Sequence, residues 1–240
     1  MSTILSCSLD LYNIVICDTR ITTFNAHGEK SSNDENLKIH YIENYGYFTG
    51  IGIGQLARGT FDFFKEQRVK NEMTLHSAFI RAYESIHNDD NGNDEVCAML
   101  NQSAVFVSSK EKITAFSHSF QMTTGSEQVC LKRNQINIQY PYDIGMELRE
   151  IIGSSTQLTD DWGIERILLL MLETFKTISN NSEDVSDICN VAIMGKNMGL
   201  PFFVQGKVSD VIENIRNMTF YGLENQFEHY KEKLLEWNDI

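Results

Sequence analysis

The stretch that decides the expected fold lies at the N-terminus and reads Ser2-Thr-Ile-Leu5, continued by Ile14-Val-Ile-Cys-Asp18-Thr-Arg20. Two apolar runs, Thr3–Leu9 and Tyr12–Thr19, flank Asp10. Apolar runs of this length on either side of a short polar break are typical of two paired β-strands. The chain is therefore expected to begin with a short hairpin.

A second pair of strands is expected at Leu37–Ile42 and Tyr45–Gly50, with a turn at Glu43-Asn44. A polar loop that ends with Ser31-Ser-Asn-Asp-Glu-Asn36 is expected to join the two pairs. The glycines of Gly50-Ile-Gly-Ile-Gly54 end the fourth strand and open a helix. The N-terminal quarter of the chain is thus predicted to be mainly β-structure.

Beyond these strands, apolar residues at helical spacing predict helices, and short apolar runs predict further strands. The expected elements are a helix over 75–86, strands near Val96–Leu100, Ala104–Ser108 and Ile113–Phe116, a helix within Asp143–Ile152, a helix over 164–178, a strand over Asp187–Met194 and a helix over 223–237. Two consecutive helices exclude simple alternating βα units. The order favours an α+β fold, a four-layer αββα sandwich with two antiparallel sheets, formed by a single domain over residues 1–240.

The composition excludes several classes of protein. The 240 residues include 20 Lys and Arg against 33 Asp and Glu, a net charge of −13, which argues against a nucleic-acid-binding protein. No apolar run approaches the roughly 20 residues that a membrane helix needs, and the N-terminus lacks the features of a signal peptide. Five scattered cysteines without a CxxC pair indicate reduced, buried thiols in a cytoplasmic protein. The chain has no HExxH motif, no Walker A loop and no GxSxG elbow, so neither a metal site nor a cofactor is expected.

One glycine motif leaves alternatives open. Gly52-Ile-Gly54-Gln-Leu-Ala57 fits the GxGxxA form of the dinucleotide-binding fingerprint. That fingerprint requires a returning parallel strand with an acidic residue about 20 positions on, where this chain has the start of another helix. A tight turn from strand to helix is the favoured interpretation. A nucleotide site and an oxyanion site formed by exposed backbone N–H groups are the two alternatives.

The N-terminus itself contains a candidate nucleophile. Ser2 is small, so removal of Met1 would leave a chain that begins with a free serine. Its α-amine, with an ordinary pKa of about 7.7–8.0, can accept the hydroxyl proton of the same residue. This chemistry also needs a cation, an anion that positions the cation, and donors for an oxyanion. Asp18, Arg20, Lys38 and the Gly50–Gly54 segment can provide all three if the first strands pair.

With Asn36-Leu-Lys38-Ile-His-Tyr-Ile42 and Tyr47-Phe-Thr-Gly-Ile-Gly52 added, the chain resembles proteasome β-subunits and the bacterial ATP-dependent protease peptidase subunit. Both are N-terminal-nucleophile hydrolases. Ser2 precedes Asp18 by 16 residues and Lys38 precedes Gly52 by 14, and both intervals match the family spacing. The resemblance is clear over 2–64 and weaker at 124–126 and 185–189. It implies the αββα sandwich of that family and a hydrolase that cleaves peptide or other amide bonds through an acyl-enzyme.

The resemblance also implies a role for each matching residue. Ser2 would be the nucleophile with its α-amine as the base, and Lys38, paired with Asp18, would lower the pKa of the Ser2 hydroxyl. The Gly52 N–H would donate to the oxyanion, at a position where a side chain would obstruct the substrate. The other implied site residues are Arg20, which would brace the adjacent loop; Ser126 with Asp184 or Asp187, which would hold the amine; and Ile21, His40, Gly50 and Gly54, which would lie near the substrate.

Taken singly, these residues have plainer interpretations. Ser2 could belong to a disordered terminus, Asp18 and Arg20 could form a surface ion pair, Lys38 could be a solvated strand residue, Ser126 could cap a helix and Asp184 could lie in an acidic loop. The chain also departs from the family, which usually begins with Thr and has Ala where Ile21 stands. The 127–159 stretch is longer than its family counterpart and is expected to be an atypical insertion.

Family members assemble into rings, so the resemblance implies a homo-oligomer, a peptide or amide substrate, and an ATP-dependent unfoldase as a candidate partner. No cofactor is implied. An alternative from another class is a catalytically silent, proteasome-like subunit with a structural or binding role. Retention of Met1 would favour that alternative, because the chain would then lack the amine base.

Overall fold

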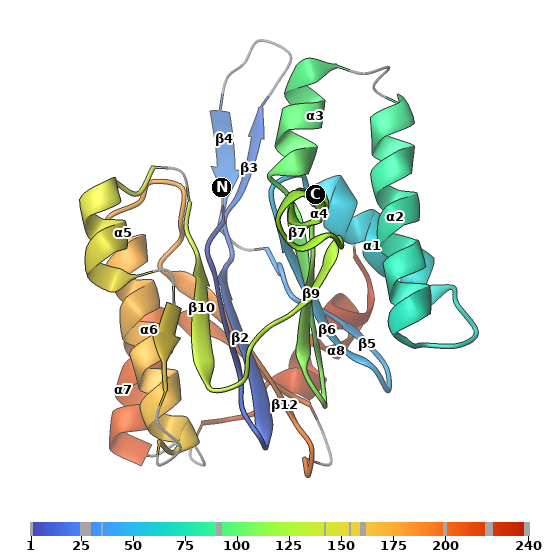
Figure 1. The fold of residues 1–240 in the computed structure, drawn as a ribbon. Coiled ribbons are helices and arrows are strands. Elements are labelled where there is room, and N and C mark those ends of the chain that lie inside the picture. Colours follow the sequence, from blue (N-terminus) through green and yellow to red (C-terminus); the bar gives the residue numbers. More distant parts are fainter. Residues whose placement is uncertain are drawn as a thin grey trace.

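The computed structural model describes residues 2–24, 30–34, 36–89, 93–141, 143–153, 155–158, 162–198, 201–218 and 223–237. Two antiparallel sheets form the centre of the molecule, and helices cover the outer face of each (Figure 1). The first sheet has the strand order β11-β10-β1-β2-β12-β13, and the second has the order β5-β6-β7-β8-β9. A separate two-stranded ribbon is formed by β3 and β4.

The strands are β1 (Ile4–Ser8), β2 (Tyr12–Asp18), β3 (Ile21–Phe24), β4 (Lys30–Asn33), β5 (His40–Ile42), β6 (Gly46–Ile51), β7 (Ala104–Ser109), β8 (Ile113–Phe116), β9 (Gln128–Cys130), β10 (Gln135–Gln139), β11 (Ser155–Gln157), β12 (Ile188–Gly195) and β13 (Phe202–Lys207). The helices are α1 (Gly54–Lys65), α2 (Glu72–Asp89), α3 (Asp94–Asn101), α4 (His118–Thr124), α5 (Met146–Ile152), α6 (Ile164–Ser179), α7 (Val208–Met218) and α8 (Phe227–Leu235).

Strand β2 lies inside the first sheet and is buried on both faces. Its side chains alternate, so that Ile14 and Ile16 join the core beneath α6 and α7, whereas Val15 and Cys17 join the core between the two sheets. The expected hairpin is confirmed, because β1 and β2 are antiparallel partners with Ile4 opposite Cys17. Apolar side chains on both faces therefore place this hairpin between two layers.

The second sheet is covered by α1 and α2. Phe48 of β6 belongs to one buried cluster with Phe61 and Phe64 of α1 and Phe79 of α2. Helices α5, α6 and α7 lie on the far side of the first sheet (Figure 1). Helix α8 contacts β5 and β13, at an edge of each sheet. The four-layer αββα sandwich that the sequence predicts is therefore the observed architecture.

Two local predictions are wrong. Residues 96–100 belong to α3 and do not form a strand, because Asn93 caps the helix by accepting from the Glu95 amide and acidic residues occupy its first turn. The polar loop expected after Arg20 contains β3 and β4, paired with Ile21 opposite Asn33. The four residues of β4 are all polar, and β3 has apolar residues only at its ends, so neither segment shows the apolar alternation that predicts a strand.

The 127–159 segment contributes β9 to the second sheet and β10 and β11 to the first. Its strand β10 pairs with β1, and β11 pairs with β10, so this segment supplies one edge of the first sheet.

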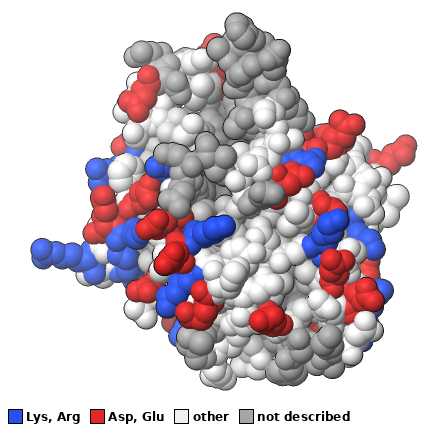
Figure 2. Space-filling model, turned by 180° about the vertical axis from the view of Figure 1, so that it is seen from behind, with Lys and Arg blue, Asp and Glu red and all other residues white. Residues whose placement is uncertain are grey.

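On the face that Figure 2 shows, Lys and Arg side chains are interspersed with Asp and Glu. Over the described ranges of the chain, no helix is both long and apolar enough to cross a membrane.

Candidate active site

Three of the predicted site residues meet where β1 begins, β2 ends and β5 is about to begin. The Lys38 ammonium donates one hydrogen bond to Ser2 Oγ and another to Asp18 Oδ2, each 2.7 Å long. Ser2 lies directly before Thr3, whose amide donates to Asp18 Oδ1 at 3.0 Å. Because β1 and β2 are antiparallel, the residues just before β1 lie beside Asp18 at the end of β2, although they stand at opposite ends of the hairpin in sequence.

The Asp18 carboxylate is fully buried and carries several charge-stabilising contacts. Besides Lys38 and the Thr3 amide, the Arg20 amide donates to Oδ2 at 3.0 Å. A buried charge is tolerated only when paired and hydrogen-bonded, and Asp18 meets both conditions. The interpretation of Asp18 and Arg20 as a surface ion pair is wrong, because the partner of the Asp18 charge is Lys38.

Arg20 braces an adjoining loop, as the resemblance implies. Its Nε and Nη2 atoms lie 2.6 Å and 2.7 Å from the two carboxylate oxygens of Asp34, a bidentate pair, and Nη1 donates to the Glu183 carbonyl. The hydrogen bonds with Asp34 raise the pKa of Arg20, and the same contact lowers the pKa of Asp34. Sequence reasoning missed Asp34, which had no signal beyond its charge in a polar loop.

Gly52 stands at the strand-to-helix turn that leads into α1. It is exposed, with a φ of +84°, a backbone conformation that favours glycine. A Cβ there would lie 2.1 Å from Ser103 Oγ. Ser103 therefore leaves no room for a side chain at this position, and obstruction of the substrate by such a side chain stays a prediction. Ser103 Oγ also accepts from the Ile53 amide at 2.9 Å, so this unforeseen residue fixes the turn.

The expected substrate-binding residues lie in different surroundings. Ile21 opens β3 next to Arg20. Gly54 begins α1 with nothing within 4 Å of a Cβ added there. At Gly50 an added Cβ would meet the Cβ of Ala57 at 2.5 Å, so the absence of a side chain lets α1 pack on β6.

His40 lies in the core, which corrects its expected place near the substrate. The side chain is 4% exposed, and its ring stacks on Trp237 with centroids 3.9 Å apart. Burial lowers the pKa of His40 to about 4. Neither ring nitrogen of His40 has a hydrogen-bond partner within the described residues. Backbone groups of Glu236, Leu37 and Lys233 lie close enough to oppose the lowering of the His40 pKa, but outside hydrogen-bonding geometry.

The residues expected to hold the amine lie in two loops. The Ser126 hydroxyl, just after α4, accepts from the Gln128 amide at 3.2 Å. Asp184 lies near enough to Arg20 to raise the pKa of its guanidinium, and the Asp187 carbonyl accepts from the Val208 amide at 2.9 Å. Met1, whose removal the chemistry requires, is outside the described residues. The contact of any of these residues with the amine stays a prediction.

The nucleotide interpretation of the glycine motif is wrong. Helix α1 leads into α2, and β6 pairs antiparallel with β5 and β7, so no parallel βαβ unit surrounds Gly52. In the part of the chain that the structure describes, no group of three or more His, Cys, Asp or Glu side chains is placed to hold a metal ion.

No protein-family model and no curated protein sequence matches the chain. Solved structures do match. The Anbu Gly-1 mutant from Hyphomicrobium sp. strain MC1 has a TM-score of 0.60 and 12% identity, covering 100% of both chains. BPH from Thiobacillus denitrificans in complex with epoxomicin has a TM-score of 0.50 and 11% identity, covering 82% of this chain and 100% of BPH.

Eukaryotic HslV from Trypanosoma brucei has a TM-score of 0.47 and 12% identity, covering 80% of this chain and 99% of HslV. Identities of 11–12% support a likeness in fold only. The match to Anbu extends over the whole of both chains, and the αββα layers agree with it. The chain therefore shares the fold of Anbu and of BPH, with two antiparallel sheets between layers of helices.

Proposed function

We propose that the chain is an N-terminal serine hydrolase that cleaves peptide or other amide bonds after Met1 is removed. The observation that carries this proposal is the position of the Lys38 ammonium, 2.7 Å from both Ser2 Oγ and Asp18 Oδ2. Lys38 is 8% exposed, so it is not the solvated strand residue of the plainer interpretation. A cation held by a buried carboxylate against a hydroxyl oxygen favours the negative charge that develops on that oxygen during attack.

Acylation begins when Ser2 Oγ attacks the carbonyl carbon of the substrate. The Oγ–C bond forms, the hydroxyl proton passes to the α-amine of Ser2, and the carbonyl electron pair moves to oxygen. The Gly52 N–H donates to this oxyanion from an exposed turn that Ser103 holds in place. The C–N bond then breaks, and the amine returns the proton to the leaving nitrogen.

Deacylation repeats the sequence with water. The α-amine takes a proton from the attacking water as the new C–O bond forms. The Oγ–C bond then breaks and the amine returns that proton to Oγ, which releases the acid and restores Ser2. Asp18 holds Lys38 in place throughout, and Arg20 holds the adjoining loop. Ser126 with Asp184 or Asp187 is proposed to orient the amine.

The intact mass of protein purified without an N-terminal tag is the first test, because a free Ser2 is a precondition. A fluorogenic peptide and amide library then tests hydrolysis by the wild type, Ser2→Ala and Lys38→Ala. Ser77→Ala, an exposed serine on α2, is the matched control. We expect the control to keep its activity and both site variants to lose it while they stay folded. Full activity in both site variants would reject the mechanism.

A retained Met1 would instead support the catalytically silent subunit, because the base would be blocked. Assembly is part of the proposal in either case, as a homo-oligomer that could form a ring, with an ATP-dependent unfoldase as a candidate partner and the cytoplasm as its location. Light scattering on the protein as it elutes from a size-exclusion column measures the mass of the assembly. A monomer at micromolar concentration would reject that part.

A further inference from the structure

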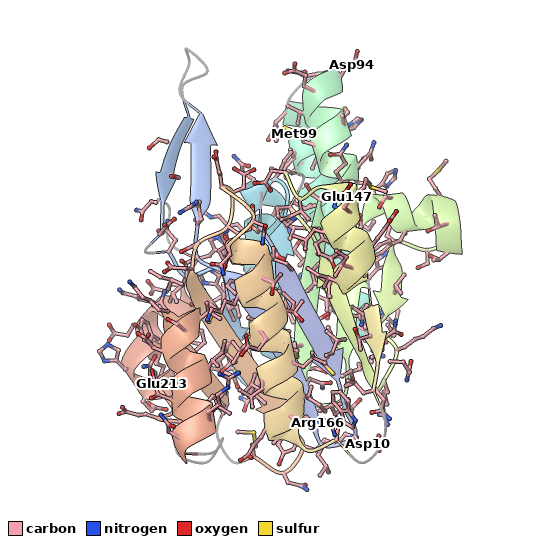
Figure 3. All side chains as sticks on the ribbon, turned by 90° about the vertical axis from the view of Figure 1, so that its left-hand side faces the viewer. Asp10, Asp94, Met99, Glu147, Arg166 and Glu213 are labelled. Carbon is pink, nitrogen blue, oxygen red and sulfur yellow. The ribbon has the colours of Figure 1, made fainter. Side chains whose placement is uncertain are left out.

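Asp143, in the turn before α5, contacts three consecutive residues of the loop between α6 and β12. Ser182 Oγ lies 2.7 Å from both of its carboxylate oxygens, and Oδ2 accepts from the Glu183 amide at 2.9 Å and the Asp184 amide at 3.3 Å. Figure 3 shows α5, marked by Glu147, near the end of α6 that leads into this loop. One carboxylate therefore organises the whole turn, because charged acceptors form the stronger hydrogen bonds.

The 127–159 segment holds Asp143 in position through contacts of its own. Arg149, on α5, donates from Nη2 to the Pro141 carbonyl at 2.7 Å and from Nε to the Ile144 carbonyl at 3.0 Å. Pro141 and Ile144 are buried on either side of Asp143 in the chain, whereas Asp143 is exposed. The carboxylate is thus presented by a clamped turn and not by a free loop.

The loop that Asp143 organises contacts the candidate active site through Arg20. The Glu183 carbonyl accepts from the Arg20 guanidinium, and the Arg20 amide donates to Asp18. Asp18 in turn accepts from Lys38, the donor to Ser2. A displacement of the loop therefore removes one of the contacts that fix Arg20 beside the Lys38–Asp18 pair.

We propose that Asp143 is a positioning residue for the hydrolytic site, and that the 127–159 segment serves to supply it. The inference rests on the proposed function of Ser2. Asp143 acts by holding the 182–184 turn, so that Arg20 keeps its place beside Asp18. An error of about 1 Å in a catalytic group can cost about 100-fold in rate, so a residue outside the site can control turnover.

The first test compares Asp143→Ala with Glu147→Ala, which removes a carboxylate from the same segment without touching the 182–184 turn. With the fluorogenic substrate found for the wild type, we expect kcat of Asp143→Ala to fall about tenfold or more with little change in KM. We expect Glu147→Ala to match the wild type. Asp143→Asn keeps one acceptor oxygen and should recover part of the rate, which a purely steric role would not predict.

A double-mutant cycle tests whether the effect passes through Arg20. If it does, the Asp143→Ala/Arg20→Ala variant should lose little more rate than Arg20→Ala alone, because the second change removes a contact that is already lost. Additive losses would overturn the coupling. Urea unfolding of each variant shows whether a lower rate reflects a loss of folded protein. If Asp143→Ala does not fold, Asp143→Asn replaces it in the cycle.

Hydrogen exchange measured by mass spectrometry gives a readout that needs no substrate. Asp143→Ala should exchange faster than the wild type and Glu147→Ala in peptides covering 180–187 and in those covering 18–24. Unchanged exchange at 18–24 would overturn the inference. The two proposals fail separately: an active Ser2→Ala variant rejects the hydrolase mechanism, whereas an inactive Ser2→Ala beside a fully active Asp143→Ala rejects only the role of Asp143.

Discussion

The ammonium of Lys38 lies 2.7 Å from a carboxylate oxygen of Asp18, in a pair that is almost withdrawn from solvent. The Asp18 side chain is 0% exposed and the Lys38 side chain 10% exposed. Removing two charges from water costs several kcal/mol each, and only mutual attraction and further hydrogen bonds offset it. The backbone amides of Thr3 and Arg20 complete the coordination of the carboxylate. Replacing only one member of the Lys38–Asp18 pair is therefore expected to lower the free energy of unfolding much more than replacing both.

We expect Lys38→Met to lower the free energy of unfolding by about 3–5 kcal/mol, because a buried carboxylate is left without its countercharge. The double variant Asp18→Asn/Lys38→Met should be less destabilised than the sum of the two single variants. Urea unfolding of the four proteins measures both quantities. Simple additivity would show that the two side chains do not act as a pair.

A pair of glycines two residues apart should respond to alanine in opposite directions. Gly52→Ala forces a side chain into a φ of +84° and against Ser103, so we expect a loss of stability larger than about 1 kcal/mol. Gly54 begins α1 with open space around it, so Gly54→Ala should stabilise the protein by about 0.4–1 kcal/mol. Equal changes in the free energy of unfolding for the two variants, measured with urea, would contradict the strand-to-helix turn at Gly52.

His40 makes stability depend on pH. Burial lowers its pKa from 6.5 to about 4, so the unfolded chain binds the proton more readily than the folded one. The resulting stability is fully present above pH 6.5 and is lost as the pH falls towards 4, by about 3 kcal/mol in total. His40→Phe should remove this part of the decline, and His229→Gln, at an exposed position, should leave it in place. Urea unfolding at pH 4.5 and pH 7 measures the free energy of unfolding of the wild type, His40→Phe and His229→Gln.

The thiols divide into two groups by accessibility. Cys7, Cys17 and Cys189 are buried, and burial raises the pKa of Cys7 and Cys17 to about 12. Cys130 is exposed and Cys97 is partly exposed, so the prediction of buried thiols is wrong for these two residues. A disulfide reagent at neutral pH should therefore titrate two thiols in the folded protein and five after unfolding. Cys130→Ser should reduce the count in the folded protein to one, and a third rapidly reacting thiol would contradict the packing of the first sheet.

Local sequence patterns were sufficient for much of the fold. The apolar runs of β1 and β2 on either side of the polar break at Asp10 predicted the first hairpin, and the 3.6-residue stripe predicted α2 and α6. The pattern failed for α3, where a capping asparagine and two acidic residues outweighed a short apolar run. The β3–β4 ribbon was missed because β4 is polar throughout and β3 has apolar residues only at its two ends.

From the sequence alone, the order of elements predicted the αββα layers, and the spacing shared with proteasome β-subunits predicted that Asp18 and Lys38 lie beside Ser2. The antiparallel register of β1 and β2 is the physical reason that the N-terminus and Asp18 meet, because it brings both to the same end of the hairpin. Only the tertiary structure decided that Asp34 binds Arg20, that Ser103 meets Gly52, that Asp143 holds the 182–184 turn and that His40 is buried against Trp237. These contacts join segments 14 to 197 residues apart, and their geometry depends on how separately formed layers pack against one another.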